Sequence, residues 1–328
     1  METAKLGKTG FDVSVVGQGC WQFGGNWGEV SNDESLGVLH AAADGGVTFY
    51  DTADVYGNGH SEELIGQFLR ERRDDSLVVA TKLGRRAKPL VAEAFTRENL
   101  RAWTERSLRL LGVDVIDLTQ LHCPPTVVFS DAAVYDAMDE LVDDGWIRNY
   151  GVSVETVEEA LTALEHPGVA TIQLICNVFR RKPLEQVLPA AKAAGVGIIA
   201  RVPLASGLLS GRFTADTTFV ATDHRTYNRN GESFDQGETF SGVPYEVGVE
   251  AAQEFAALVP EGVTPAQYAL RWILDQDGIS TVIPGASRAT QAAANAAAAD
   301  LPPLTAEQST ALAELYDRRI REYVHGRW

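Results

Sequence analysis

Short apolar runs alternate with helix-like segments along almost the whole 328-residue chain. Such alternation indicates a parallel sheet covered by helices, and eight strands suffice to close a barrel. The eight strand-like runs are Val13–Val16, Val47–Tyr50, Leu77–Ala80, Val115–Leu121, Ile147–Val152, Thr171–Ile175, Gly197–Val202 and Thr281–Ile283. We therefore predict an α/β fold, a (β/α)8 TIM barrel, with residues 1–328 forming one domain.

The segments between these runs carry helix signals. Thr96–Leu111 places apolar residues along one stripe, and Ser130–Asp144 stops at a glycine. Three other helices open with a capping box, in which Thr is followed three residues later by Glu or Gln. These boxes are Thr156–Glu159, Thr264–Gln267 and Thr305–Gln308.

Two segments fall outside the repeat. Residues 1–12 contain a turn-like Gly7–Gly10 and are expected to form a hairpin that closes the barrel floor. Residues Ser206–Tyr245 are rich in Gly, Asp, Thr and Asn and lack periodicity. Because this long segment follows the seventh strand, it should emerge on the face where barrel active sites form. We interpret it as a flap over the site, with a disordered insertion as the alternative.

Polar residues stand at or just beyond three successive strand ends: Asp51 and Tyr56, then Lys82, then His122. A lysine beside a tyrosine favours the phenolate, so Tyr56 is the candidate proton donor. A buried lysine needs a counter-charge, and Asp51 can supply it, either for catalysis or as a structural ion pair. Asp54 is interpreted as a loop-forming residue without a chemical role.

The motifs Asp51-Thr-Ala-Asp-Val-Tyr56-Gly, Thr81-Lys82 and Leu121-His122 resemble the catalytic segments of aldo-keto reductases. The resemblance implies a tetrad of Asp51, Tyr56, Lys82 and His122. Tyr56 would act as general acid, and His122 would position the substrate carbonyl. Trp21 and Trp27, on the loop after the first strand, would line the substrate pocket with Tyr56 and His122.

The same resemblance implies a nicotinamide cofactor at the barrel mouth, with NADPH preferred and NADH possible. Ser153 and Gln173 would hold the nicotinamide amide, and Arg201 would lie beside the ring or the pyrophosphate. Ser287 and Arg288 would suit a 2′-phosphate. The remaining predicted cofactor residues are Gly19, Cys20, Trp21, Pro203, Leu204, Gly207, Leu209, Gly211, Gly285, Gln291 and Asn295. The chain departs from the family pattern at Cys20, where Thr is usual, and at Val154, where Asn is usual. Arg201 also replaces an aromatic residue found in many relatives.

The composition limits the classes of partner that this chain is expected to bind. The net charge of -17 disfavours nucleic acid and anionic membranes. Three cysteines without metal-ligand spacing predict neither a disulfide framework nor a metal site, and they suit a reducing cytoplasm. The N-terminal residues show no signal-peptide pattern. We expect a cytoplasmic monomer or homo-oligomer that acts on a small molecule.

The predicted function is an NAD(P)H-dependent oxidoreductase that transfers hydride between nicotinamide and a small aldehyde, ketone, sugar or alcohol. One alternative is an NAD-linked alcohol or sugar dehydrogenase on the same fold. Another is a cofactor-binding regulatory subunit with little turnover, because relatives of the family serve as channel subunits.

Overall fold

A barrel of eight parallel strands forms the centre of the protein, whose computed structural model describes all 328 residues. Its strands are β3 (Gln18–Gly19), β4 (Phe49–Asp51), β5 (Val78–Leu83), β6 (Leu118–His122), β7 (Tyr150–Ser153), β8 (Val169–Ile175), β9 (Gly197–Arg201) and β10 (Ile279–Val282). Each strand pairs with the next one along the chain, and the first and last meet through the parallel bridges Val16–Val282 and Gly19–Gly285. The predicted (β/α)8 barrel is confirmed.

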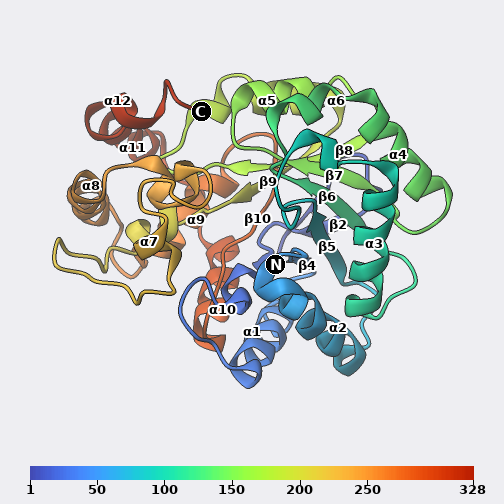
Figure 1. Ribbon diagram of the computed structural model, residues 1–328. Helices are drawn as coiled ribbons and strands as arrows, with labels where there is room; N and C mark the ends of the chain where they lie inside the picture. Colours follow the sequence, from blue (N-terminus) through green and yellow to red (C-terminus); the bar gives the residue numbers. More distant parts are fainter.

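Helices surround the strands (Figure 1). They are α1 (Asn32–Asp44), α2 (His60–Arg72), α3 (Arg97–Leu111), α4 (Ala132–Asp143), α5 (Val157–Ala163), α6 (Val187–Ala194), α7 (His224–Tyr227), α8 (Tyr245–Ala257), α9 (Pro265–Leu274), α10 (Ala289–Ala296), α11 (Ala306–Arg319) and α12 (Arg321–Val324). All three predicted capping boxes are present, at the starts of α5, α9 and α11. At the start of α2, the buried Ser61 hydroxyl accepts from the Thr52 hydroxyl and donates to the Cys20 carbonyl.

An N-terminal hairpin covers the floor of the barrel. It pairs β1 (Thr3–Lys5) with β2 (Asp12–Ser14), and its turn lies against the start of β9, where a Cβ on Gly7 would meet the Gly197 nitrogen. The predicted hairpin is thus confirmed, but the prediction of Val13–Val16 as the first barrel strand is wrong. Val13 belongs to the hairpin and fills the barrel interior, so the first barrel strand is the shorter Gln18–Gly19.

Apolar side chains inside the barrel hold the strands in register. This interior cluster consists of Leu6, Val13, Phe49, Val78, Ala80, Leu118, Ile199 and Ile283. A second, larger core lies between the barrel and the helices. The interior cluster fills the barrel below the site, so the polar residues at the strand ends rest on a packed base.

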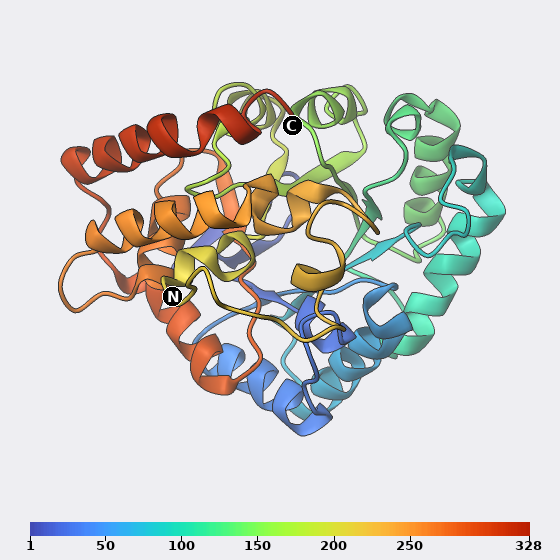
Figure 2. The ribbon, with the colours of Figure 1, turned by 60° about the vertical axis from the view of Figure 1, so that its left-hand side comes forward.

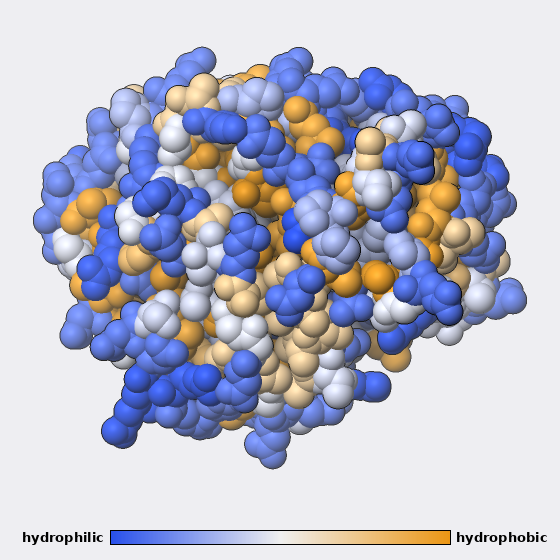
Figure 3. All heavy atoms as spheres, turned by 180° about the vertical axis from the view of Figure 1, so that it is seen from behind, coloured by the Kyte–Doolittle hydropathy of each residue, from blue (hydrophilic) through white to orange (hydrophobic).

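The face seen from behind carries both hydrophilic and hydrophobic side chains (Figure 3). Seen from behind, hydrophilic side chains cover the rim and interrupt the hydrophobic areas (Figure 3). None of the helices is both long enough and apolar enough to cross a membrane.

Residues 206–245, called the flap below, lie across the mouth of the barrel beside the loop that follows β3 (Figure 2). The flap contains α7 and several 3-10 turns. The Asn26 carbonyl accepts hydrogen bonds from the backbone and the ring of His224, and the Asn26 amide donates to the Tyr227 hydroxyl. The flap is therefore a folded cover docked on the barrel.

Candidate active site

Four side chains from the ends of adjacent strands converge at the barrel mouth. Asp51 ends β4, Lys82 is the penultimate residue of β5, and His122 ends β6. Tyr56 lies on the 3-10 turn between β4 and α2. The Lys82 Nζ lies 2.5 Å from the Asp51 Oδ1, 2.8 Å from the Thr52 carbonyl and 3.3 Å from the Tyr56 hydroxyl. The structure thus brings the predicted Asp, Tyr and Lys together.

The Asp51 carboxylate connects Lys82 to two further side chains on neighbouring strands. Its other oxygen accepts from the Gln120 amide at 3.2 Å and from the Gln173 amide at 2.8 Å. Burial opposes the charge on Lys82, but the Asp51 carboxylate and the Tyr56 hydroxyl together outweigh burial, so the pKa of Lys82 is raised. Lys82 is therefore a permanent cation beside the phenol.

The Tyr56 phenol differs from the sequence expectation in its acidity. Burial raises its pKa, and the opposing effect of Lys82 offsets only part of the rise. Lys82 thus lowers the pKa of the phenol as predicted, but burial, which the sequence pattern does not reveal, has the larger effect. The phenol remains protonated at neutral pH, as a proton donor must.

His122 is a neutral imidazole. Burial and the positive charges of Arg85 and Lys82 lower its pKa well below the usual range. Its Nε2 lies 3.4 Å from the Arg85 guanidinium, and its ring stands edge-on to Tyr56 with 5.8 Å between the ring centroids. The imidazole therefore packs against the phenol ring, with its Nε2 next to Arg85.

Two arginines and two glutamates form an ion-pair network beside the tetrad. Arg201, at the end of β9, lies 2.8 Å from Glu155 and 3.5 Å from Glu238. Arg85, after β5, lies 2.7 Å from the same Glu238, which belongs to the flap. Burial alone would raise the pKa of Glu238, but Arg85 and Arg201 hold it well below its usual range. Sequence reasoning missed Arg85, Glu155 and Glu238 because these residues lie on separate loops.

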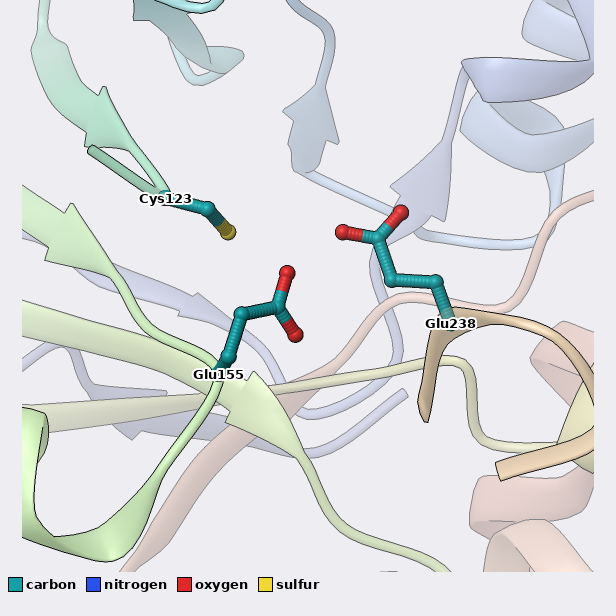
Figure 4. A group of neighbouring side chains, drawn as sticks. All are labelled: Cys123, Glu155 and Glu238. Carbon is teal, nitrogen blue, oxygen red and sulfur yellow. The ribbon is translucent and has the colours of Figure 1, made fainter. Parts of the chain in front are cut away.

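Cys123, Glu155 and Glu238 point toward one another, with ligand atoms within 4.8 Å (Figure 4). Such a group resembles a metal-ligand set. Burial raises the pKa of the Cys123 thiol, however, so its sulfur stays protonated. Arg85 and Arg201 already supply the positive charge that a metal ion would bring. We therefore assign the group to the ion-pair network.

Comparison with known proteins identifies the family. The profile of the Aldo/keto reductase family matches residues 15–317.

The chain belongs to the aldo/keto reductase family.

A curated relative, the aldo-keto reductase YhdN of Bacillus subtilis, is 34% identical over 298 residues, which cover 89% of this chain and 86% of the relative. A probable voltage-gated potassium channel subunit beta of Arabidopsis thaliana is 31% identical, covering 93% of both chains. The solved structure of the glycerol dehydrogenase AKR11B4 from Gluconobacter oxydans is 31% identical. It superposes with a TM-score of 0.79 over 97% of this chain and 96% of its own.

In this aldo/keto reductase, the residues expected to hold the nicotinamide amide lie side by side. Ser153 pairs in register with both His122 and Gln173. The Gln173 amide nitrogen donates to Asp51 and Gln120, and its side-chain oxygen makes no hydrogen bond. The Ser153 hydroxyl lies 3.4 Å from the Cys123 sulfur. Gln173 therefore supports Asp51, a role that the sequence did not indicate, while its oxygen stays free.

Three residues that are expected to contact the cofactor lie at the ends of β3 and β10: Gly19, Cys20 and Gly285. Gly19 approaches the end of β10 so closely that a Cβ would lie 2.8 Å from the Ile283 carbonyl, so only glycine fits. Cys20 is buried and donates its backbone N–H to the Asp51 carbonyl. Gly285 packs against the side chain of Gln22. These residues shape the wall on the Trp21 side of the mouth.

The expected pyrophosphate loop, Ala205–Ser210, consists of two short 3-10 turns joined by a kink at Ser206 and Gly207. Gly207 has φ +98°, a conformation that other residues rarely adopt. Pro203 and Leu209 are buried, and Leu204 is half-buried. Gly211 ends the turn and packs near Pro265 and Ala256.

The expected adenosine segment clusters after β10. The Ser287 backbone and hydroxyl both donate to the Gln291 side chain, and Asn295 donates to the Gly285 carbonyl. Arg288 precedes α10, is exposed, and makes no side-chain hydrogen bond or ion pair. This cluster lies on one loop and one helix, as the sequence pattern predicted.

The two tryptophans predicted to line the substrate pocket are in contact. The Trp21 ring stacks near Tyr56 with 6.2 Å between centroids, and it meets Trp27 edge-on at 5.3 Å. The flap residues His224 and Phe234 complete the group at 4.7 Å and 6.0 Å from Trp21. The sequence could not place these two, because they lie about two hundred residues away in an aperiodic segment.

Asp54 does not have the role assigned from the sequence. It is buried, and neither carboxylate oxygen has a hydrogen-bond partner, so it forms no side-chain turn. Burial and the neighbouring Glu62 raise its pKa to about 7. The loop interpretation fails because the residue faces the protein interior.

Proposed function

We propose that this protein reduces small carbonyl compounds with NADPH and that Tyr56 is the general acid. The observation that carries the proposal is the Asp51–Lys82–Tyr56 chain of contacts, which holds a protonated phenol beside a fixed cation. Lys82 stabilises the phenolate that forms as the proton leaves, and Asp51 holds Lys82 in place. The His122 Nε2 accepts from Arg85, so the neutral ring carries its hydrogen on Nδ1, which has no partner in the protein and is the only ring atom that could donate to a carbonyl oxygen.

The residues at the barrel mouth fit a nicotinamide dinucleotide. The free side-chain oxygen of Gln173 could accept from the nicotinamide amide. The unpaired Arg288 lies before α10 and would suit a 2′-phosphate, which favours NADPH over NADH. When bound, the cofactor would supply the hydride for the carbonyl carbon, while Tyr56 gives its proton to the oxygen.

Replacing Tyr56 with Phe tests the proposal. Initial rates over an aldehyde and ketone panel should fall ~10²–10⁴-fold, because general-acid catalysis is lost. NADPH affinity, measured by calorimetry, should stay nearly unchanged. Tyr268→Phe is the matched control, since it removes a hydroxyl that has no hydrogen-bond partner. A variant that keeps more than about half of the wild-type rate would show that the proton comes from elsewhere.

Experiments can distinguish two other candidate functions from NADPH-dependent carbonyl reduction. An NAD-linked alcohol or sugar dehydrogenase would show faster initial rates for alcohol oxidation with NAD⁺ than for carbonyl reduction with NADPH. A regulatory subunit is suggested by the 31% identical relative named as a probable channel subunit. In that case the protein would bind the cofactor stably yet show negligible turnover over a broad carbonyl panel.

A further inference from the structure

The turn that carries Tyr56 has a backbone conformation that needs support from other parts of the chain. The three residues that follow Tyr56 all have positive φ, with +59° at Gly57, +56° at Asn58 and +97° at Gly59. A left-handed asparagine costs free energy and persists only where the surrounding structure holds it. The backbone of Gly24 lies against the turn, where a Cβ would come within 2.8 Å of the Gly57 nitrogen. Asn58 itself is held by a side chain from a neighbouring helix.

That side chain is Arg106, a residue of α3. Its Nη2 donates a hydrogen bond to the Asn58 carbonyl at 2.5 Å. The guanidinium also packs on Gly59, where a Cβ would lie 2.5 Å from Nη2. Because a guanidinium presents several N–H donors in a fixed plane, it can bind a carbonyl and a carboxylate at once. The second terminal nitrogen of Arg106, Nη1, is therefore free to face an acidic group.

Glu62, a fully buried residue of α2, is the acidic partner of Arg106. The Arg106 Nη1 lies 3.8 Å from the Glu62 Oε2, and both atoms are buried without a hydrogen-bond partner. The other Glu62 oxygen accepts from the Thr81 hydroxyl at 2.6 Å. Thr81 directly precedes Lys82 in β5. One chain of contacts thus runs from the turn that carries Tyr56 to the strand that carries Lys82.

We propose that Arg106 is a positioning residue for Tyr56, and that Glu62 ties Arg106 to the strand of Lys82. The Tyr56 hydroxyl and the Lys82 Nζ lie 3.3 Å apart, although they come from different elements of the barrel. The Arg106–Glu62 pair joins these two elements without a hydrogen bond to the phenol itself. The inference rests on the proposed role of Tyr56 as general acid. Displacement of such a group by ~1 Å can cost about 100-fold in rate.

Arg106→Ala tests the positioning role. With NADPH and a panel of aldehydes, kcat should fall about 10–100-fold, because the turn no longer holds the phenol in place. The KM for NADPH should stay nearly unchanged. Arg109→Ala, at an exposed residue of the same helix, is the matched control and should keep the wild-type kcat. A wild-type kcat in Arg106→Ala would overturn the inference, and so would a matching loss of NADPH affinity, which indicates general damage to the fold.

Two further variants separate positioning from a simple loss of stability. Arg106→Lys keeps the charge but lacks the planar fork, so it should recover part of the lost kcat. Glu62→Gln keeps an oxygen for Thr81 and removes the charge that faces Arg106. The double variant with Arg106→Ala should lose no more kcat than Arg106→Ala alone, because the pair acts as one unit. Losses that multiply would show that Glu62 acts independently and would overturn its part in the proposal.

Hydrogen exchange keeps the inference testable if the reductase function itself fails. Absence of turnover by the wild type would refute the proposed function alone. The amides of Tyr56, Asn58 and His60 donate hydrogen bonds within the turn, so their exchange reports how firmly it is held. They should exchange about 10-fold faster in Arg106→Ala than in the wild type, while the amides of β8 stay unchanged. Equal exchange of the turn in both proteins would overturn the inference.

Discussion

Glu238 lies 2.7 Å from Arg85, although 153 residues separate them in the sequence. The contact joins the flap to the loop after β5, directly beside His122. The flap is therefore fixed to the side of the barrel mouth that carries His122 by charge, and to Trp21 and Trp27 by aromatic packing. Because the carboxylate also faces Arg201, its loss leaves two guanidinium groups without their shared partner.

Glu238→Gln should weaken this attachment. Removing one partner of a buried ion pair costs about 3 kcal/mol of stability, which urea unfolding can measure. NADPH should also dissociate several-fold faster in stopped-flow experiments, because the flap covers the mouth less firmly. Glu232→Gln is the control on the same segment, where the side chain is exposed. Unchanged stability and unchanged release would show that the contact contributes nothing to flap closure.

Lys82→Met should shift the pH dependence of alcohol oxidation. In that direction Tyr56 must be deprotonated, and Lys82 is the group that lowers its pKa. Without the cation the phenol pKa rises further, so the rise of kcat/KM with pH moves to higher pH. Asp51→Asn should depress the rate, since Lys82 loses its anchor. A pH profile of Lys82→Met with the wild-type midpoint would rule out the coupling, and Lys192→Met, an exposed lysine, serves as control.

Arg288→Ala should weaken NADPH binding and spare NADH. A charged contact with the 2′-phosphate is worth ~1.5–3 kcal/mol, or roughly 10–150-fold in affinity. Fluorescence titration with both cofactors measures the difference, and Arg109→Ala, another exposed arginine, is the control. Equal weakening for both cofactors would place Arg288 on their shared part, and no change for either would make it a surface residue without a role.

Asp54→Asn should stabilise the protein at alkaline pH. The folded-state pKa of about 7 lies above the unfolded value, so the folded state holds the proton more tightly. Stability is therefore lost as the pH rises from about 4 to 7, when the buried carboxyl is forced to ionise. Asparagine never ionises, so the gain in melting temperature should be larger at pH 8 than at pH 5. An equal difference at both pH values would contradict the prediction; Asp114→Asn, at an exposed aspartate, is the control.

The sequence revealed local features well. The strand ends that carry Asp51, Lys82 and His122 follow apolar runs, and capping boxes mark helix starts by residue type alone. The first barrel strand was predicted at Val13–Val16 but lies at Gln18–Gly19. The sequence could not separate the two, because a buried hairpin strand and a barrel strand have the same apolar pattern. The sequence also did not reveal how deeply the Tyr56 side chain is buried, and burial has the largest effect on its pKa.

Long-range contacts could not be predicted. The partners of Arg201 come from the loop after β7 and from the flap, and no spacing rule connects them. His224 and Asn26 meet only because the barrel brings its first and seventh loops together. The pairing of Gln173 with Asp51 likewise depends on register across several strands. For this reason the gathering of Asp51, Tyr56, Lys82 and His122 at the barrel mouth was predicted from the sequence, whereas the ion-pair network was not.

Trp328 anchors residues 235–242 of the flap. Its indole donates to Asp235, stacks on Arg180 and lies under Gly242, while Arg180 also holds the Ser241 carbonyl. Residues 235–242 are thus clamped from beneath. The half that carries α7 is held mainly from the side, through Asn26 and the tryptophans. We expect α7 to move outward when the site opens, while residues 235–242 of the flap stay in place.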